Sequence, residues 1–320
     1  MESYVNIASA VDSMAVRFPN SLSIVFPEGR DKTGRVSYTH YTFRQLAEET
    51  RIIAKGLECA GIKRGCRTVL MVKPSLEFFA LTFALFKAGI VPVLIDPGIG
   101  IKNLKTCISE AEPEAFIGIP SAHIARKILG WGKETIKKNI TVGKKLFWGG
   151  YTLDEIRVIG KSLKEYEFPK TSADEMAAIL FTSGSTGIPK GVVYNHGNFV
   201  AQLEMIRKVY KIEPGEIDLP TFPLFALFDP ALGMTTIVPD MDATKPAKVE
   251  PLKIIEAIEN FGVTNMFGSP ALLNTVGRYG VEHNIKLPSL RRVISAGAPV
   301  PAIVMERFSK MLSPDTQIFT

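Results

Sequence analysis

Apolar residues spaced as in a helix alternate along this chain with short segments that are apolar throughout. Residues 43–57 place their apolar side chains three or four positions apart, which predicts a helix, and Gly61 follows as its stop. The next run, Thr68-Val-Leu-Met-Val72, has the short apolar character of a buried strand. The same order of helix, glycine and strand returns at residues 75–96 and 252–267. The pattern predicts repeated helix–strand units.

Strands that are apolar along their whole length are typical of parallel sheets covered by helices on both faces. The chain is therefore expected to have an α/β architecture with layers built on parallel sheets. Its composition, 46% hydrophobic and 22% charged, is that of a globular protein with a sizeable core. A length of 320 residues corresponds to about two domains of ordinary size.

Charge and cysteine usage narrow the classes of function. The net charge of +6 suits anionic ligands, but the densest basic run, 126–145, is interpreted as a solvated surface, and nucleic-acid binding is not inferred. Cys59, Cys66 and Cys107 lack metal-ligand spacing and indicate free thiols in a reducing compartment. No signal peptide and no apolar run near the roughly 20 residues of a membrane span are present, so a soluble, cytoplasmic protein is expected. The oligomeric state is left open.

Residues 182–191, Thr-Ser-Gly-Ser-Thr-Gly-Ile-Pro-Lys-Gly, carry the strongest chemical signal. They follow the apolar run Met176-Ala-Ala-Ile-Leu-Phe181 directly, which places the loop at the end of a buried strand. Glycines let the backbone approach a ligand closely, hydroxyl groups add hydrogen bonds, and Lys190 adds a mobile positive charge. These features predict a polyphosphate site, and hence a chain that handles a nucleoside triphosphate.

Two familiar nucleotide motifs do not fit this segment. A Walker loop needs Gly-x4-Gly-Lys followed by Ser or Thr, but Ile188 and Pro189 separate Gly187 from Lys190, and Gly191 occupies the hydroxyl position. Proline and glycine there also argue against a helix that starts in the loop. The Gly-x-Gly-x-x-Gly pattern of dinucleotide-binding folds is not satisfied either. A flexible linker is the plainer alternative, but a linker has no reason to follow a buried strand.

The loop closely resembles the phosphate loop of the adenylate-forming (AMP-binding) superfamily, which includes acyl-CoA synthetases, the adenylation domains of peptide synthetases, and luciferases. Phe86–Pro97 resembles the Lys-Ala-Gly core motif of that superfamily. Thr221–Pro230 stands where the superfamily has its aromatic acyl-pocket motif, and Ser295–Pro299 resembles its segment against the adenine ring. The motifs occur in the superfamily's order, and the resemblance runs from about residue 40 to Thr320.

The resemblance implies the large N-terminal domain of the superfamily, with two α/β subdomains. We expect residues 65–205 to form the subdomain with the phosphate loop, and residues 1–64 together with 206–320 to form the second. Gln317-Ile-Phe-Thr320 resembles the strand that leads into a Tyr-Gly-x-Thr-Glu motif. The sequence is therefore interpreted as an incomplete AMP-binding domain, truncated before the β-barrel and the C-terminal domain, and expected to be inactive by itself.

The same resemblance implies a reaction in which ATP activates a carboxylic acid as an acyl-adenylate and pyrophosphate leaves. Catalysis then rests on positioning and on neutralising the leaving group, for which Lys190 and Thr186 are the expected catalytic residues. Mg²⁺ is expected at Thr182 or Thr186, with its main carboxylate ligand beyond Thr320. The residues expected to bind the nucleotide are Thr182, Ser183, Gly184, Ser185, Thr186, Gly187, Lys190, Gly297, Ala298 and Pro299.

An apolar slot for the acyl group is expected around the aromatic motif, although each of its residues could equally fill the core. The expected lining residues are Phe222, Phe225, Ala226, Phe228, Met266 and Gly268. Many relatives carry a histidine at the position aligned with Ala226. Because this chain has alanine there, the role of that histidine is not carried over to it. The apolar surroundings favour a fatty or aryl acid over an amino acid.

Two stretches, Asp96–Lys105 and Glu112–Pro120, are similar to the β-lactone synthetases of bacterial olefin biosynthesis, which are often labelled fatty-acid-CoA ligases. Those enzymes adenylate a β-hydroxy fatty acid, whose own hydroxyl then closes a four-membered ring. The competing enzyme hypothesis is an acyl-CoA synthetase, in which the thiol of CoA attacks the adenylate. A non-catalytic module that binds a nucleotide or an acyl group, and an adenylation domain for an amino or aryl acid, stay open as well.

Overall fold

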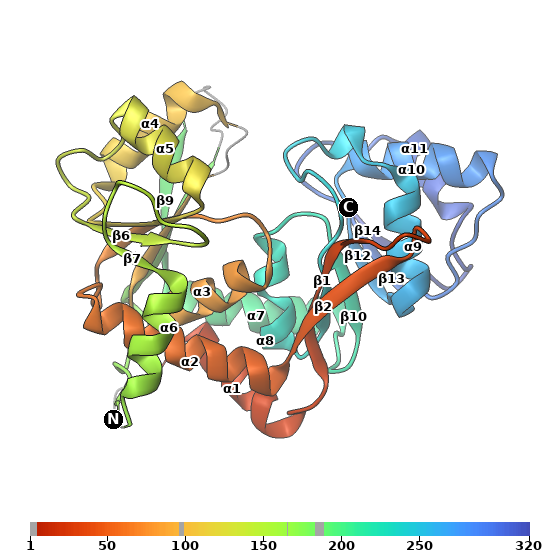
Figure 1. Ribbon diagram of the computed structural model, residues 1–320. Helices are drawn as coiled ribbons and strands as arrows, with labels where there is room; N and C mark the ends of the chain where they lie inside the picture. Colours follow the sequence, from red (N-terminus) through yellow and green to blue (C-terminus); the bar gives the residue numbers. More distant parts are fainter. Residues whose placement is uncertain (1–4, 96–98, 165, 183–188) are drawn as a thin grey trace. The chain divides into compact units, whose positions relative to one another are not determined.

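The computed structural model describes residues 5–320 apart from 96–98, 165 and 183–188 (Figure 1). The chain divides into two compact units. The first contains the residues up to Ser13 together with Arg44–Ile206, and the second contains Met14–Phe43 and Arg207–Thr320. Each unit is built around one sheet, so the expected α/β architecture with parallel-sheet layers is confirmed.

The sheet of the first unit has seven strands among the described residues, in the order β7-β6-β5-β3-β4-β8-β9. Its neighbours run parallel except for β8 and β9, which form an antiparallel pair at one edge. All five residues of β4 are buried, as expected for a strand covered on both faces. The strands are β3 (Arg67–Met71), β4 (Val91–Ile95), β5 (Ala115–Gly118), β6 (Lys138–Thr141), β7 (Tyr151–Thr152), β8 (Met176–Thr182) and β9 (Lys190–Asn195).

Helices connect these strands, as the alternating pattern predicts. Ser75 caps α3 by accepting a hydrogen bond from the N–H of Phe78 at 3.3 Å, and the helix is buried from Phe78 to Lys87. Among the described residues no helix is long and apolar enough to cross a membrane. The helices are α1 (Ile7–Arg17) and α7 (His196–Tyr210), which both extend into the second unit, and α2 (Phe43–Cys59), α3 (Leu76–Lys87), α4 (Ile101–Ala111), α5 (Pro120–Leu129) and α6 (Leu153–Ser162).

Helix α2 belongs to the first unit, which differs from the expected boundary at residue 64. The reason is its close packing on α6 through two glycines. A Cβ on Gly56 would overlap the carbonyl oxygen of Ile156, and a Cβ on Gly160 would overlap that of Ile52. An ion pair between Arg157 and Glu49 adds a polar contact between the same helices. Sequence spacing identifies both helices, but it cannot reveal that their backbones meet.

Replacing Gly160 by alanine is expected to destabilise the protein by about 1–3 kcal/mol, because the added methyl group overpacks this crossing. Helix propensity alone predicts the opposite sign, since alanine in a helix is favoured over glycine by about 1 kcal/mol. Urea unfolding decides between the two. The matched control is Gly277→Ala in another helix, where the Cβ would make an ordinary contact of 3.5 Å with Phe308. Equal stabilisation by both substitutions would show that α2 and α6 are not in close contact.

The sheet of the second unit also has seven strands in the described part, in the order β14-β13-β12-β10-β11-β1-β2. Only the edge pair β1–β2 is antiparallel. The strands are β1 (Leu22–Arg30), β2 (Val36–Thr42), β10 (Ile217–Pro220), β11 (Thr235–Ile237), β12 (Asn265–Phe267), β13 (Arg292–Ile294) and β14 (Gln317–Phe319). The predicted strand at 263–267 therefore begins two residues later, at Asn265.

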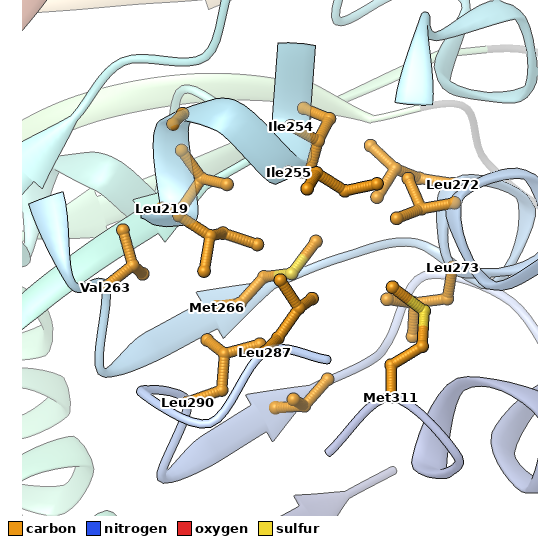
Figure 2. Close-up of a cluster of buried hydrophobic side chains, with 14 of the residues drawn as sticks. Leu219, Ile254, Ile255, Val263, Met266, Leu272, Leu273, Leu287, Leu290 and Met311 are labelled. Carbon is orange, nitrogen blue, oxygen red and sulfur yellow. The ribbon is translucent and has the colours of Figure 1, made fainter. Parts of the chain in front are cut away.

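One hydrophobic cluster holds the helices of this unit to its sheet (Figure 2). Leu219, Met266 and Val293, from three neighbouring strands, are fully buried and pack with apolar side chains of α9 and α10. The helical segments are η2 (Phe225–Leu227), α8 (Asp229–Leu232), η3 (Pro246–Lys248), α9 (Pro251–Phe261), α10 (Pro270–Glu282) and α11 (Ala302–Ser309).

Candidate functional site

The phosphate-loop segment connects two neighbouring strands of the first unit. β8 ends at Thr182 and β9 begins at Lys190, and these two residues form the last antiparallel pair of the ladder. The structure thus describes the base of the loop, but neither the side chain of Thr182 nor the residues at its centre. Five predicted nucleotide-binding residues lie outside the described part: Ser183, Gly184, Ser185, Thr186 and Gly187.

The base of the loop is a hairpin, whereas a Walker loop leads from a strand into a helix. The geometry therefore agrees with the failed Walker spacing. Gly191 faces Phe181 across the ladder, and a Cβ at Gly191 would lie 3.0 Å from the phenylalanine ring. Because Gly191 has no side chain, the two strands can pair while the ring of Phe181 stays buried beside it. Lys190, beside it, is exposed at the exit of the loop.

His196, which follows this hairpin, is a packing residue. Its ring is fully buried, and neither ring nitrogen has a hydrogen-bond partner among the described residues. Burial lowers the pKa of His196 to about 4, so the ring is neutral near pH 7. A buried neutral imidazole 6.4 Å from the ring of Phe86 belongs to the apolar interior.

The other two predicted binding segments begin at one edge of the second unit's sheet. β10, β12, β13 and β14 run parallel, so their carboxyl ends meet there. The aromatic segment follows β10 and the adenine segment follows β13. Backbone hydrogen bonds continue past the strand ends, from the N–H of Gly268 to the carbonyl of Ile294 (2.9 Å) and from that of Ser295 to the carbonyl of Phe319 (2.9 Å). Ligands of open α/β sheets bind at this kind of edge.

The aromatic segment packs on the end of β12. The hydroxyl of Thr221 donates a hydrogen bond of 2.8 Å to the carbonyl of Phe267. The ring of Phe225 stands edge-to-face on that of Phe267, with centroids 4.5 Å apart, and Phe222 lies 5.3 Å from Phe225. Although Phe225 is large and apolar, it is 45% exposed. The carboxyl edge therefore presents an apolar aromatic surface to solvent.

The structure does not place all the predicted pocket residues on that surface. Ala226 is only 2% exposed, and Met266 is fully buried within the hydrophobic cluster, as Figure 2 shows. Side chains alternate between the two faces along a strand, so the residue of β12 beside the aromatic segment is Phe267 instead of Met266. Gly268 packs against α10, because a Cβ there would lie 2.8 Å from Leu273. Phe228 is half-buried.

The predicted adenine segment is an open stretch of backbone after β13. Gly297 has a φ of 91°, in the left-handed region that favours glycine, and nothing lies within 4 Å of the position of a Cβ on it. Ala298 and Pro299 are exposed as well. Ser295, just before them, is buried, and its hydroxyl has no hydrogen-bond partner among the described residues. Because Gly297 has no side chain, a planar ring could approach the backbone of this segment closely.

A buried ion pair fixes the strands that carry these segments, and the sequence interpretation missed it. Arg292 of β13 pairs with Glu216, which directly precedes β10, and donates a hydrogen bond of 2.6 Å to Asn265 of β12. Asn265 in turn donates to Glu216 at 2.6 Å. Burial raises the pKa of Glu216, but the hydrogen bonds from Arg292 and Asn265 outweigh it and leave that pKa below its usual value. The feature of the sequence that could have indicated this ion pair is Arg292, a charged residue directly before the apolar residues Val293 and Ile294.

Two further carboxyl groups lie buried next to the aromatic segment. Asp218 of β10 and Asp229 at the start of α8 are 7% and 4% exposed and are hydrogen-bonded to each other. Burial raises the pKa of Asp218 to about 7; burial, and then the charge of Asp218, raises that of Asp229 well above its usual value. The signal in the sequence was an aspartate inside the apolar strand 217–220.

Metal binding receives no support from side-chain clusters in the described part of the chain. No group of three or more His, Cys, Asp or Glu side chains there could hold a metal ion. The predicted Mg²⁺ ligands, Thr182 or Thr186, have side chains outside that part. Hydroxyl oxygens suit Mg²⁺, which takes few protein ligands beside substrate phosphates.

Comparisons with known proteins agree with this arrangement. The family described as AMP-binding enzyme matches residues 12–319. The olefin beta-lactone synthetases of Xanthomonas campestris pv. campestris and Stenotrophomonas maltophilia are each 48% identical, over 100% and 98% of this chain and 57% and 56% of their own lengths. The chain thus spans about half the length of these curated relatives.

A crystal structure of a long-chain-fatty-acid-CoA ligase from Archaeoglobus fulgidus superposes with a TM-score of 0.84 at 18% identity, covering 99% of this chain and 64% of the other. At that identity the likeness concerns the fold, and it confirms the predicted architecture. The family match over nearly the whole sequence confirms the resemblance inferred from the motifs. This chain belongs to the AMP-binding enzyme family.

Proposed function

We propose that the protein containing this chain activates a carboxylic acid with ATP to form an acyl-adenylate and pyrophosphate. The observation that carries the proposal is the phosphate-loop sequence between β8 and β9, in a chain matched by the AMP-binding family over residues 12–319. The open adenine segment after β13 and the exposed aromatic surface after β10 would supply the two other binding surfaces that the reaction needs.

In this reaction a carboxylate oxygen attacks the α-phosphorus of ATP, and the bond from that phosphorus to the β-phosphate oxygen breaks. Negative charge then grows on the departing pyrophosphate. Lys190, exposed at the exit of the loop, would stabilise that charge together with loop N–H and hydroxyl groups. Mg²⁺, when bound, would neutralise part of the triphosphate charge. Gly297, Ala298 and Pro299 would lie against the adenine.

For the substrate we propose a fatty acid with a β-hydroxyl group, and β-lactone formation as the second step. The identity of 48% to olefin beta-lactone synthetases supports this class, and the Phe222–Phe225–Phe267 surface suits an apolar tail. The β-hydroxyl oxygen would attack the acyl carbon, AMP would leave with its oxygen, and the hydroxyl proton would pass to solvent. An acyl-CoA ligase would instead use the CoA thiol as the attacking group.

The test is isotope exchange between pyrophosphate and ATP in the whole protein, with plain and β-hydroxy fatty acids, followed by product analysis with and without CoA. Acid-dependent exchange and a lactone formed without CoA would support the proposal. Thioester formation that requires CoA would identify an acyl-CoA ligase. Exchange with amino or aryl acids alone would reassign the substrate, and a lack of exchange with every acid would leave a binding module.

Position 226 offers a test of the acyl surface. Ala226→Phe is expected to shift preference toward shorter acids, because Ala226 is buried within the aromatic segment and overpacking there costs about 1–3 kcal/mol. The measurement is the exchange rate over a series of acid chain lengths. Ala247→Phe, at an exposed position of the same unit, is the matched control. Unchanged chain-length preference in the folded Ala226 variant would remove this segment from the acyl site.

A further inference from the structure

The aromatic segment is a loop closed at its base by two buried carboxyl groups. From Asp218 within β10 the chain passes through residues 219–228 and returns at Asp229, whose side chain is hydrogen-bonded to that of Asp218. Every residue of the exposed aromatic surface except Phe267 lies within this loop. The contact between the two carboxyl groups thus fixes both ends of the segment that is proposed to meet the acyl tail.

A third side chain orients the pair. Thr236 of β11 is the parallel-sheet partner of Asp218 in the register of β10 and β11. Its hydroxyl donates a hydrogen bond of 3.2 Å to the Oδ2 of Asp229. The backbone carbonyl of Asp229 also accepts the N–H of Met234 at 2.9 Å, which ties the first residue of α8 to the chain leading into β11. Asp229 is therefore held from two neighbouring strands.

Two buried carboxylates cannot both be ionised at hydrogen-bond distance without strong repulsion, so the pair is stable only while it holds a proton. The neighbouring charge that acts on it is that of Glu216, which further disfavours a second negative charge at Asp218. Arg292 does not relieve the pair, because it is engaged by Glu216 and Asn265. The hydrogen bond between the two groups lowers the pKa of Asp218 and raises that of Asp229, so Asp229 is the residue that keeps the proton.

We propose that Asp218 and Asp229 are positioning residues: they share one proton, and this proton holds the aromatic segment in the shape that binds the apolar tail of the acid. The inference rests on the proposed function only for the identity of the ligand. Loss of the proton would leave two facing charges at the base of the loop and loosen it. Tail binding should then weaken as the pH rises, while ATP binding should not.

Asn at position 229 imitates the protonated state. Its amide N–H₂ can donate to Asp218 at every pH, and its carbonyl oxygen can accept from Thr236. Asp229→Asn should therefore keep the closed loop and lose its pH dependence. Asp229→Ala should remove the donor and open the loop at every pH. Asp315→Asn, an exposed aspartate of the same unit, is the matched control.

The experiment measures the dissociation constant of tetradecanoate and the KM for ATP in the whole protein at several values between pH 6 and 9. A carboxylic acid is ionised throughout that range, so the ligand itself does not titrate. For the unmodified protein and Asp315→Asn, the dissociation constant should rise by up to roughly tenfold per pH unit once the pH passes the raised pKa of Asp229. For Asp229→Asn it should stay flat, and the KM for ATP should be constant in all three.

The stability of the same proteins provides a second readout. Because both folded-state pKa values are raised, the folded protein binds more protons than the unfolded chain between about pH 4 and 7. Its free energy of unfolding should therefore fall as the pH rises through that window, and fall less in Asp229→Asn. A slope identical in both proteins would show that the pair shares no proton.

The outcomes separate this inference from the proposed function. Acid-dependent exchange with tail binding that has the same pH profile in Asp229→Asn as in the unmodified protein would overturn the inference and leave the function intact. Binding that follows the predicted profile without any exchange would overturn the function and support the inference. No binding of tetradecanoate at any pH would overturn the assignment of the loop to the acyl tail.

Discussion

Replacing Lys190 by alanine in the whole protein is expected to slow acid-dependent pyrophosphate exchange by about tenfold to a hundredfold or more. A hydrogen bond to a charged group is worth roughly 1.5–3 kcal/mol. Lys190 is exposed at the end of the phosphate loop, where it pairs with Thr182 in the strand ladder. Because the charge on pyrophosphate grows as the reaction proceeds, the loss should fall mainly on the rate at saturating ATP.

The control for this experiment is Lys127→Ala, which removes an exposed lysine from α5 of the same unit. This substitution should leave the rate of pyrophosphate exchange unchanged, since an exposed lysine outside the loop contributes little to stabilising the leaving pyrophosphate. If a folded Lys190→Ala protein exchanged at the normal rate, the loop between β8 and β9 would not be the phosphate site. A matching loss in the Lys127 variant would instead indicate a general effect of net charge.

The largest effect on stability is expected from Arg292→Leu, at about 3–5 kcal/mol, because the substitution leaves the carboxylate of Glu216 buried without its partner. This ion pair and Asn265 join the starts of β10, β12 and β13, the strands that carry both binding segments of the second unit. Urea unfolding at pH 7 measures the loss. Arg291→Leu, an exposed neighbour in the sequence, is the control and should be nearly neutral.

The loss of stability in Arg292→Leu should also depend on pH. The pKa of Glu216 is lowered in the folded protein, so its stabilisation is present above its ordinary pKa of 4.5 and is lost as the pH falls through the lower folded value. In Arg292→Leu the unpaired carboxylate should take up a proton more readily, so the difference between the two proteins should shrink below pH 5. Leucine at both 216 and 292 should recover much of the stability. A deficit that is the same at all pH values, or a double variant no more stable than Arg292→Leu, would contradict this account.

Local patterns were sufficient for the architecture. The apolar spacing in 43–57 corresponds to α2, and the wholly apolar runs around residues 70 and 93 are β3 and β4 of a mainly parallel sheet. Such patterns succeed because burial on one helix face or on both faces of a strand is recorded in consecutive residues. The family motifs follow the same logic, since each is a contiguous segment.

Features that depend on which segments meet in space could not be predicted. The alternation along β12 decides that Phe267, and not Met266, lies beside the aromatic segment, and its register is set by β10 and β13. The pairing of Asp218 with Asp229 requires the loop to close, and the contact between Gly56 and Ile156 requires two helices to cross. None of these leaves a periodic signal.

The most direct test of the central claim follows the oxygen atoms of the acid. The whole protein is given a β-hydroxy fatty acid with oxygen-18 in its carboxylate, together with ATP and Mg²⁺ but without CoA, and the products are weighed by mass spectrometry. Attack of the carboxylate on the α-phosphorus, followed by ring closure, predicts AMP with one heavy oxygen, unlabelled pyrophosphate and a β-lactone. Heavy oxygen in inorganic phosphate beside ADP, or AMP with no label, would contradict the proposed activation of the acid.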